Sequence, residues 1–270
     1  MFDLFTSANN EFDEVVMSLL NLHSSRRPCS SETLKGYPSH SSLSRYTSIK
    51  LLVELVKRLD LPPRLSIASV HVLDSLVADF AITTKDLKSL VIASVLIVMK
   101  RMALGHQELS FQDVVSAARG SFSSYDFLYI HSIVAASTNQ VFEFPLLTAV
   151  ELLTTGVSIF NHGQTAAYYV QHYNGDYETF PKRRCYSELQ EFALTILESC
   201  LHEEFLIENS AIHSAAAILK VTTTVGVYQL YQVGFCHGIS LLFGLNQIPT
   251  CPINQIENLL RDFPLNLDMY

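Results

Sequence analysis

The chain has 270 residues, a net charge of -8 at pH 7 and only 16% charged residues. Residues of the AVILMFWYC set make up 49%, which is typical of a compact globular chain and excludes a disordered one. Nucleic-acid affinity rests largely on clustered lysines and arginines, so this acidic balance predicts no nucleic-acid partner. The five cysteines form no C-x-x-C pair, which argues against zinc and disulfides and favours a reducing intracellular compartment.

Known catalytic and targeting motifs do not occur in the sequence. There is no H-E-x-x-H run, no G-x-S-x-G, no P-loop and no G-x-G-x-x-G, so we expect no enzyme activity, no cofactor and no metal site. The first residues, "MFDLFTSANNEFDE", have neither a basic nor a sustained apolar region, so no secretory signal is expected. A low-charge stretch at 221–245 contains several Thr, Gln and Gly, which favours a buried helix pair over a membrane span. The expected location is the nucleus, the cytoplasm or both, with no membrane partner.

Residues 1–44 are predicted to hold one separate helix and an arm. In "FDEVVMSLLNL" (12–22), Phe12, Val16, Leu19 and Leu20 share one helical face. Residues 23–44 contain eight serines, two prolines and a glycine, which predicts a linker or an irregular arm.

Residues 45–142 are predicted to form a first unit of five helices. Their apolar runs are longer than ten residues and lack period-two alternation, so helix is favoured over strand. Pro62 and Pro63 end the first helix, and Asp86 follows Thr83 at the spacing of a capping box. The five segments are 45–59, 65–80, 83–104, 110–119 and 123–138.

Residues 143–270 are predicted to form a second unit of similar plan. "VLDSLVADF" (72–80) resembles "ILESCLHEEF" (196–205), and "LVIASVLIVMK" (90–100) resembles "SAIHSAAAILK" (210–220). The offsets nearly agree: 124 residues from Asp74 to Glu198, and 120 from Lys100 to Lys220. One unit is therefore used twice. In both copies the second segment is apolar on every side, which is typical of a central helix surrounded by others.

Asp74 needs a cationic partner because it lies in a run that is apolar on both sides. Arg45 begins the first helix of the unit, and that helix runs about 20 Å at 1.5 Å per residue before the second helix returns most of the distance. The planar Arg fork can hold a carboxylate with two bonds. We therefore predict a structural ion pair between Arg45 and Asp74.

This pattern resembles the cyclin box, which opens with an Arg, carries an Asp in its second helix and ends its third helix with a Lys. Arg45, Asp74 and Lys100 fall at these positions, and the resemblance covers residues 12 to about 263. It implies an all-α fold of two tandem five-helix cyclin-box domains preceded by a separate helix. It also implies a non-catalytic subunit that binds and activates a cyclin-dependent Ser/Thr protein kinase as a heterodimer, in control of the cell cycle or division.

The resemblance implies a kinase interface at Lys100 and at a Glu in the fifth helix, a position held here by His131. The acidic pair that commonly follows the Lys is replaced by Met102 and Ala103, and Ser44, Thr47 and Ser48 occupy most of a substrate-docking groove that is apolar in cell-cycle cyclins. An exposed apolar patch around Ile97, Lys100, His131 and Phe142 is expected if a kinase binds there.

Two other functions remain open. The first is a cyclin-fold scaffold in transcription or another assembly without kinase activation, as in initiation factors of the B type. Those factors bind DNA through basic surfaces, which the acidic balance here disfavours. The second is a helical carrier of apolar ligands, suggested only by the low-charge region at 221–245.

Overall fold

The computed structural model describes residues 14–15, 17–19, 21, 34–38, 42–79, 82–102, 110–118, 122–156, 184–224 and 251–261. These residues form helices and short turns and include no strand, so the all-α prediction is confirmed for them. The chain divides into two compact units. Unit 2 comprises Arg27–Phe144 and Leu197–Glu208, and unit 1 comprises Met1–Arg26, Pro145–Ile196 and Asn209–Tyr270.

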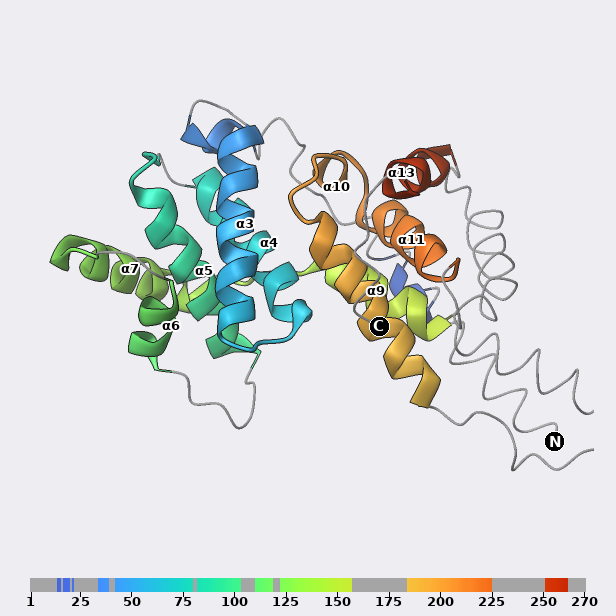
Figure 1. Cartoon of the computed structure of the whole chain (residues 1–270), viewed down its shortest axis with the longest axis horizontal. Helices are drawn as coiled ribbons and strands as arrows, with labels where there is room; N and C mark the ends of the chain where they lie inside the picture. Colours follow the sequence, from blue (N-terminus) through green and yellow to red (C-terminus); the bar gives the residue numbers. More distant parts are fainter. Residues whose placement is uncertain are drawn as a thin grey trace, which may run out of the picture. The chain divides into compact units, whose positions relative to one another are not determined.

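Unit 2 is built around one buried helix, α5 (Asp86–Arg101). This helix packs against four others, α3 (Ser42–Arg58), α4 (Pro63–Asp79), α6 (Phe111–Ala117) and α7 (Ser124–Ala136) (Figure 1). The turn η2 (Ser137–Asn139) follows α7, and the short helix α10 (Phe205–Glu208) belongs to the same unit. Most residues of α5 between Leu87 and Val98 are buried, which confirms the prediction of a central helix.

Local signals set the helix boundaries in unit 2. Pro63 opens α4, since a proline lacks the N–H that would have no partner at that position anyway. Helices α6 and α7 each begin after a complete capping box, formed by Ser110 with Asp113 and by Ser123 with Asp126. Helix α5 begins at Asp86, whose Oδ2 accepts from the Thr83 N–H at 3.1 Å and from its hydroxyl at 2.6 Å.

The prediction of an irregular arm is wrong for residues 34–38. Residues 34–36 are helical, and the Tyr37 side chain is only 1% exposed. Gly36 permits this packing, because a Cβ at that position would lie 2.3 Å from the Val77 carbonyl oxygen. The serine-rich composition predicts an irregular segment, but Gly36 and Tyr37 pack this segment against unit 2.

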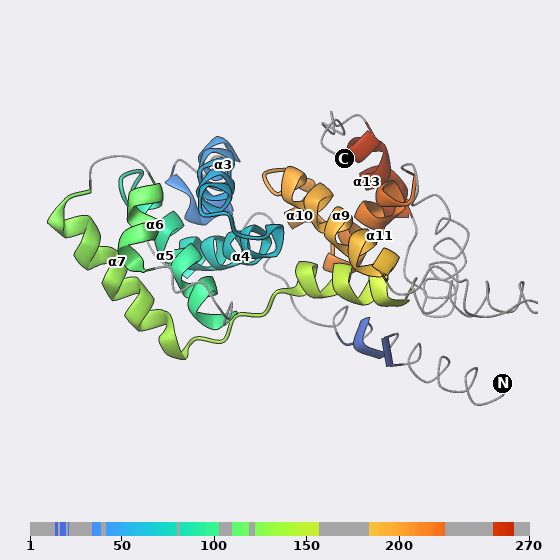
Figure 2. The same cartoon turned by 60° about the horizontal axis from the view of Figure 1, so that its bottom comes forward.

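Unit 1 contains a helix at 145–156 and the helices α9 (Arg184–Cys200), α11 (Ala211–Thr222) and α13 (Cys251–Arg261). Helix α9 begins in unit 1, and its last residues belong to unit 2. Helix α11 is buried along almost its whole length and packs against α13, as expected of a central helix (Figure 2). Val15 and Leu19, from the predicted separate helix, are also buried.

The expected buried helix pair falls largely outside the described residues. Most of the low-charge region at 221–245 lies beyond Thr224, where the described part of unit 1 breaks off until residue 251. Within the described helices, none combines the length and apolar character needed to cross a membrane.

Candidate functional site

Arg45 and Asp74 form the expected ion pair between α3 and α4. The Arg45 Nε donates to Asp74 Oδ1 at 3.1 Å, and Nη2 donates to Oδ2 at 2.9 Å. A third group, which the sequence did not suggest, completes the cluster: the Tyr37 hydroxyl donates to Asp74 Oδ1 at 2.7 Å. The carboxylate therefore receives three hydrogen bonds, two from Arg45 of α3 and one from Tyr37.

The cluster is a structural anchor, because Tyr37 and Arg45 are buried and the Asp74 side chain is only 14% exposed. Burial, together with the charge of Asp74, raises the pKa of Tyr37 well above its usual value, so the hydroxyl stays protonated and remains a donor. Burial alone would lower the pKa of Arg45, but the Asp74 carboxylate more than offsets this and raises it. The Tyr37 hydroxyl therefore stays neutral and the Arg45 guanidinium stays charged, as the hydrogen bonds to Asp74 require.

An open pocket of about 320 Å³ lies at the C-terminal end of α5. Helix α7, η2 and the segment that follows them supply its other walls. Its lining residues are Ile97, Lys100, Arg101, Val134, Ser137, Asn139, Gln140 and Val141. The pocket therefore combines apolar side chains with two cations on one end of the central helix.

The two cations of the pocket are held differently. Lys100 is exposed and forms no hydrogen bond or ion pair with any described residue. Arg101 donates from Nη2 to the carbonyl oxygen of Ser137 at 3.0 Å and to that of Gln140, and its guanidinium lies 5.0 Å from the centre of the Phe142 ring. Arg101 thus fixes the turn that walls the pocket, while Lys100 extends from its rim.

His131 does not line the pocket. Its ring is exposed and stacks on Phe111 of α6, with ring centroids 4.3 Å apart. Val134, one turn later on α7, takes a place in the lining. The structure therefore brings Ile97 and Lys100 together, links Phe142 to them through Arg101, and holds His131 one helical turn away.

The expected exposed patch differs from the observed surface. Ile97 is only 3% exposed and Phe142 is half-buried, so that part of the prediction is wrong. The exposed large apolar side chains of this region are instead Val141 at 83% and, on α7, Tyr125 and Leu128, the latter at 71%. Ile97 is buried because it belongs to the central helix, and it is one of the residues that line the pocket.

Sequence reasoning missed several residues of this surface. Arg101 directly follows Lys100, so the sequence signal that could have identified it was a second cation next to the predicted contact lysine. Helix α7 is rich in apolar residues on every side, yet only Ile130 and Ile133 are buried in it, so its remaining apolar side chains had to reach the surface. Val134 and Val141 carry no sequence signal of their own, because it is the turn between them that brings both residues to the same pocket.

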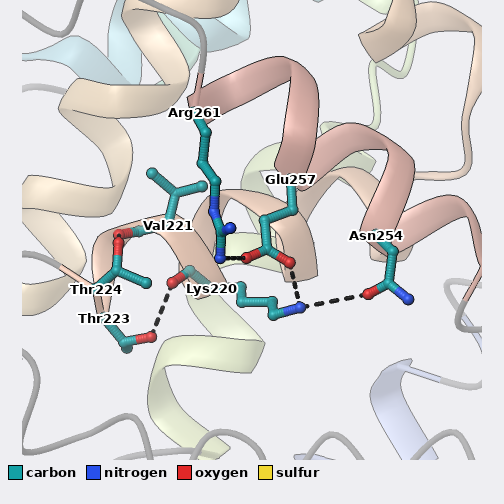
Figure 3. A network of polar contacts seen from close by, with 7 residues as sticks. All are labelled: Lys220, Val221, Thr223, Thr224, Asn254, Glu257 and Arg261. Carbon is teal, nitrogen blue, oxygen red and sulfur yellow. Dashed lines mark hydrogen bonds and ion pairs between the residues drawn. The ribbon is translucent and has the colours of Figure 1, made fainter.

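Unit 1 has a related lysine in a different setting. Lys220 of α11 reaches the Glu257 carboxylate on α13 and donates to Asn254 Oδ1 at 3.3 Å, while Arg261 donates to the other oxygen of Glu257 (Figure 3). Glu257 is buried between these two cations. This network joins α11 to α13. It pairs Lys220 with a carboxylate, whereas Lys100 has no such partner among the described residues.

The second carboxylate of the sequence repeat is also held inside the protein. Glu198 is buried, accepts from the Ser66 hydroxyl at 2.6 Å and lies 3.4 Å from Lys57 Nζ, all within unit 2. Nearby Cys200 is buried as well, and burial, helped by the charge of Glu203, raises the pKa of its thiol to about 12. A thiol with that pKa is not a nucleophile at neutral pH.

No described cluster of three or more His, Cys, Asp or Glu side chains could hold a metal ion. Comparison of the chain with protein-family models, with curated proteins and with solved structures finds no match.

Proposed function

We propose that this chain is a cyclin-like regulatory subunit, built from two tandem cyclin-box domains, that binds and activates a cyclin-dependent Ser/Thr protein kinase. The observation that carries the proposal is the pocket between α5 and α7. Lys100, the lysine that the cyclin-box resemblance assigns to the kinase contact, lines that pocket. The subunit itself would be non-catalytic and would work as a heterodimer with the kinase.

Three further features support this proposal. The pocket lies on a unit of helices packed around a buried central helix, as in a cyclin box. The Arg45–Asp74 pair joins the first two of these helices. Val141, which lines the pocket, is 83% exposed, and an exposed apolar side chain at a pocket is typical of a protein interface.

The regulatory mechanism would be a shift of a kinase equilibrium. A subunit that binds the active arrangement of the kinase more tightly than the inactive one raises the active population, and a few kcal/mol of differential affinity is enough. The rigid wall made by Arg101, Ser137 and Gln140 suits this task, because a surface that is already ordered loses little entropy on binding.

The first test is a pull-down of the tagged full chain from its own cells, with kinase activity assayed on a basic substrate. Wild type should recover a Ser/Thr kinase, and Lys100→Glu should lose at least about 80% of that activity, as expected when a contact lysine is reversed in charge. Lys85→Glu is the matched control, since Lys85 is exposed at the other end of α5. Circular dichroism must show that both variants are folded.

The alternative function is a scaffold of the same fold in transcription or another assembly, without kinase activation. The exposed side chains along α7 would suit such a role equally well. A folded wild-type chain that recovers partner proteins but no kinase activity would favour this alternative and contradict the proposed function.

A further inference from the structure

Residues 34–38, the latch segment, are seated on α3 and α4 by side-chain contacts. Tyr37 is buried, and its hydroxyl donates to Asp74 Oδ1 of α4 at 2.7 Å. One residue later, the Pro38 carbonyl oxygen accepts from the Ser44 hydroxyl of α3 at 3.1 Å. These two hydrogen bonds, each with a side chain as donor, hold the latch segment on two different helices.

The helices under the latch segment are joined without it. Arg45 of α3 binds Asp74 of α4 through two N–H donors, at 3.1 and 2.9 Å. Both helices also pack against each other and against α5. Their backbone hydrogen bonds run within each helix. Departure of the latch segment removes one of three hydrogen bonds to Asp74, so α3 and α4 stay connected.

The seat accepts the latch segment only with a glycine in front of a tyrosine. A Cβ on Gly36 would lie 2.3 Å from the Val77 carbonyl oxygen, and that backbone atom cannot move without distorting α4. A Phe at position 37 would fill the same space but would give Asp74 no hydrogen bond. The Tyr37 N–H donates to the Leu34 carbonyl oxygen at 3.2 Å, so the turn that presents the ring is formed within the segment itself. The segment therefore fits, and can leave, as one piece.

We propose that residues 34–38 open and close over Arg45 and Asp74 while the helices of unit 2 stay folded, and so gate access to this pair. In the closed state both side chains are shielded, and Arg45 Nη1 has no hydrogen-bond partner among the described residues. Opening admits water to this donor, which offsets part of the cost of exposing the Tyr37 ring. A partner that binds the pair must displace the latch segment, so its apparent affinity falls in proportion to the open fraction.

Hydrogen exchange of the full chain, followed by mass spectrometry, tests whether the latch segment opens alone. In wild type, the amides of residues 34–38 should be protected at least about tenfold less than those of α4, as expected of a local opening. Gly36→Ala should leave these amides unprotected while α4 keeps its protection. Equal protection of the segment and α4 in wild type, or joint loss of protection in Gly36→Ala, would overturn the proposal. The segment would then be part of a core that unfolds with α4.

Tyr37→Phe tests the hydroxyl separately, because the ring still fills its space. Exchange of the latch segment should become about tenfold faster, the effect of losing one hydrogen bond to a charged group. Tyr125→Phe is the matched control, since Tyr125 is exposed on α7, and it should leave the exchange of the segment unchanged. The same exchange in both variants would reject the bond between Tyr37 and Asp74 as the fastening of the latch segment.

Carbodiimide labelling of carboxylates measures access to the gated pair. Asp74 should be labelled more in Gly36→Ala than in wild type, whereas Glu54, which is exposed on α3, should be labelled equally in both. Equal labelling of Asp74 in the two proteins would overturn the gating role. None of these measurements involves a kinase, so their outcome is independent of the proposed function.

Discussion

Each unit of the molecule has a lysine near the end of a buried helix, and the two lysines are held differently. Lys220 of α11 lies against the Glu257 carboxylate of the neighbouring helix α13. Lys100 of α5 borders an open pocket whose lining, partly from the neighbouring helix α7, has no carboxylate. The two helices are similar in burial and apolar composition, so the difference arises from the helix packed beside each one.

The comparison teaches what a single carboxylate does at this position. Glu257 uses the lysine to fasten two helices of the same chain, and Arg261 on the next turn of α13 strengthens the bond. On α7 the resemblance places His131 where a Glu is expected, and its ring stacks on Phe111 instead. No described carboxylate pairs with Lys100. Among the described residues, one lysine therefore joins two helices of its unit, and the other has no ion-pair partner.

The largest loss of unfolding free energy is expected for Asp74→Ala. It serves as the reference for the variants that concern the two lysines. Arg45 is buried, and its Nη1 has no hydrogen-bond partner among the described residues, so removal of Asp74 leaves a sealed charge uncompensated. Breaking such a pair costs about 3 to 5 kcal/mol of unfolding free energy. Urea denaturation followed by circular dichroism measures this loss, and hydrogen exchange in α4 assigns it to unit 2.

Glu54→Ala is the matched control for Asp74→Ala. It breaks an ion pair of the same unit, between Glu54 and Arg58, whose carboxylate is exposed. Its expected cost is below about 1 kcal/mol. Equal losses for the two variants would contradict the view that burial makes the Asp74 cluster an anchor.

A smaller loss is expected for Glu257→Ala in unit 1. The carboxylate is buried, but Arg261 is 60% exposed and can turn to water once the bond is gone. We expect a loss of about 1 to 3 kcal/mol, the usual cost of removing one partner of a charged hydrogen bond. The measurement is hydrogen exchange in α11, with Glu191→Ala, an exposed carboxylate of α9, as the control. Loss no larger than the control would mean that Lys220 is as free as Lys100.

Part of this architecture could be predicted from the sequence because it depends on spacing along single helices. The Arg45–Asp74 pair follows from the helix rise and from the cost of an unpaired buried charge. Ile97 and Lys100 share a site because they are three residues apart on one helix. Central, buried helices follow from runs that are apolar on every side.

The remainder depends on packing between segments that have no common pattern. Tyr37 reaches Asp74 from a serine-rich arm, and the close approach of Gly36 to Val77 cannot be read from composition. Glu257 meets Lys220 across 37 residues, a separation outside both matches of the repeat. Phe111, from another helix, decides the orientation of His131. Each of these contacts is set by how two helices pack.

A modest effect is expected for His131→Glu, which brings unit 2 closer to the pattern of unit 1. The resemblance assigns a Glu at this position to the kinase contact, so the new carboxylate should strengthen binding to the kinase of the proposed function. The kinase activity recovered in the pull-down should rise about two- to fivefold, as one exposed charge pair allows. His131→Gln removes the ring stack without adding charge and should bind as wild type does. Equal changes for both variants would assign the effect to the lost stack on Phe111.

The smallest expected effect is a pH dependence of stability that is present in the first turn of α7 and absent from the first turn of α11. Helix α11 is capped by Ser210, which accepts from the His213 N–H and uses no carboxylate. Helix α7 begins with Ser123, whose N–H and hydroxyl donate to Asp126 at 2.7 and 2.6 Å. These bonds, with the side-chain bond the larger cause, lower the pKa of Asp126 from the ordinary 3.8.

Because the folded pKa of Asp126 is lowered, its contribution to stability is complete above pH 3.8 and is lost as pH falls through the folded value. NMR titration of the Asp126 carboxyl carbon should therefore give a midpoint below 3.8. Hydrogen-exchange protection in the first turn of α7 should exceed that of Asp126→Asn at neutral pH and approach it in acid. The first turn of α11 should show no such acid-dependent difference between the two proteins. A midpoint at or above 3.8 would mean that the capping box does not favour the charged carboxylate.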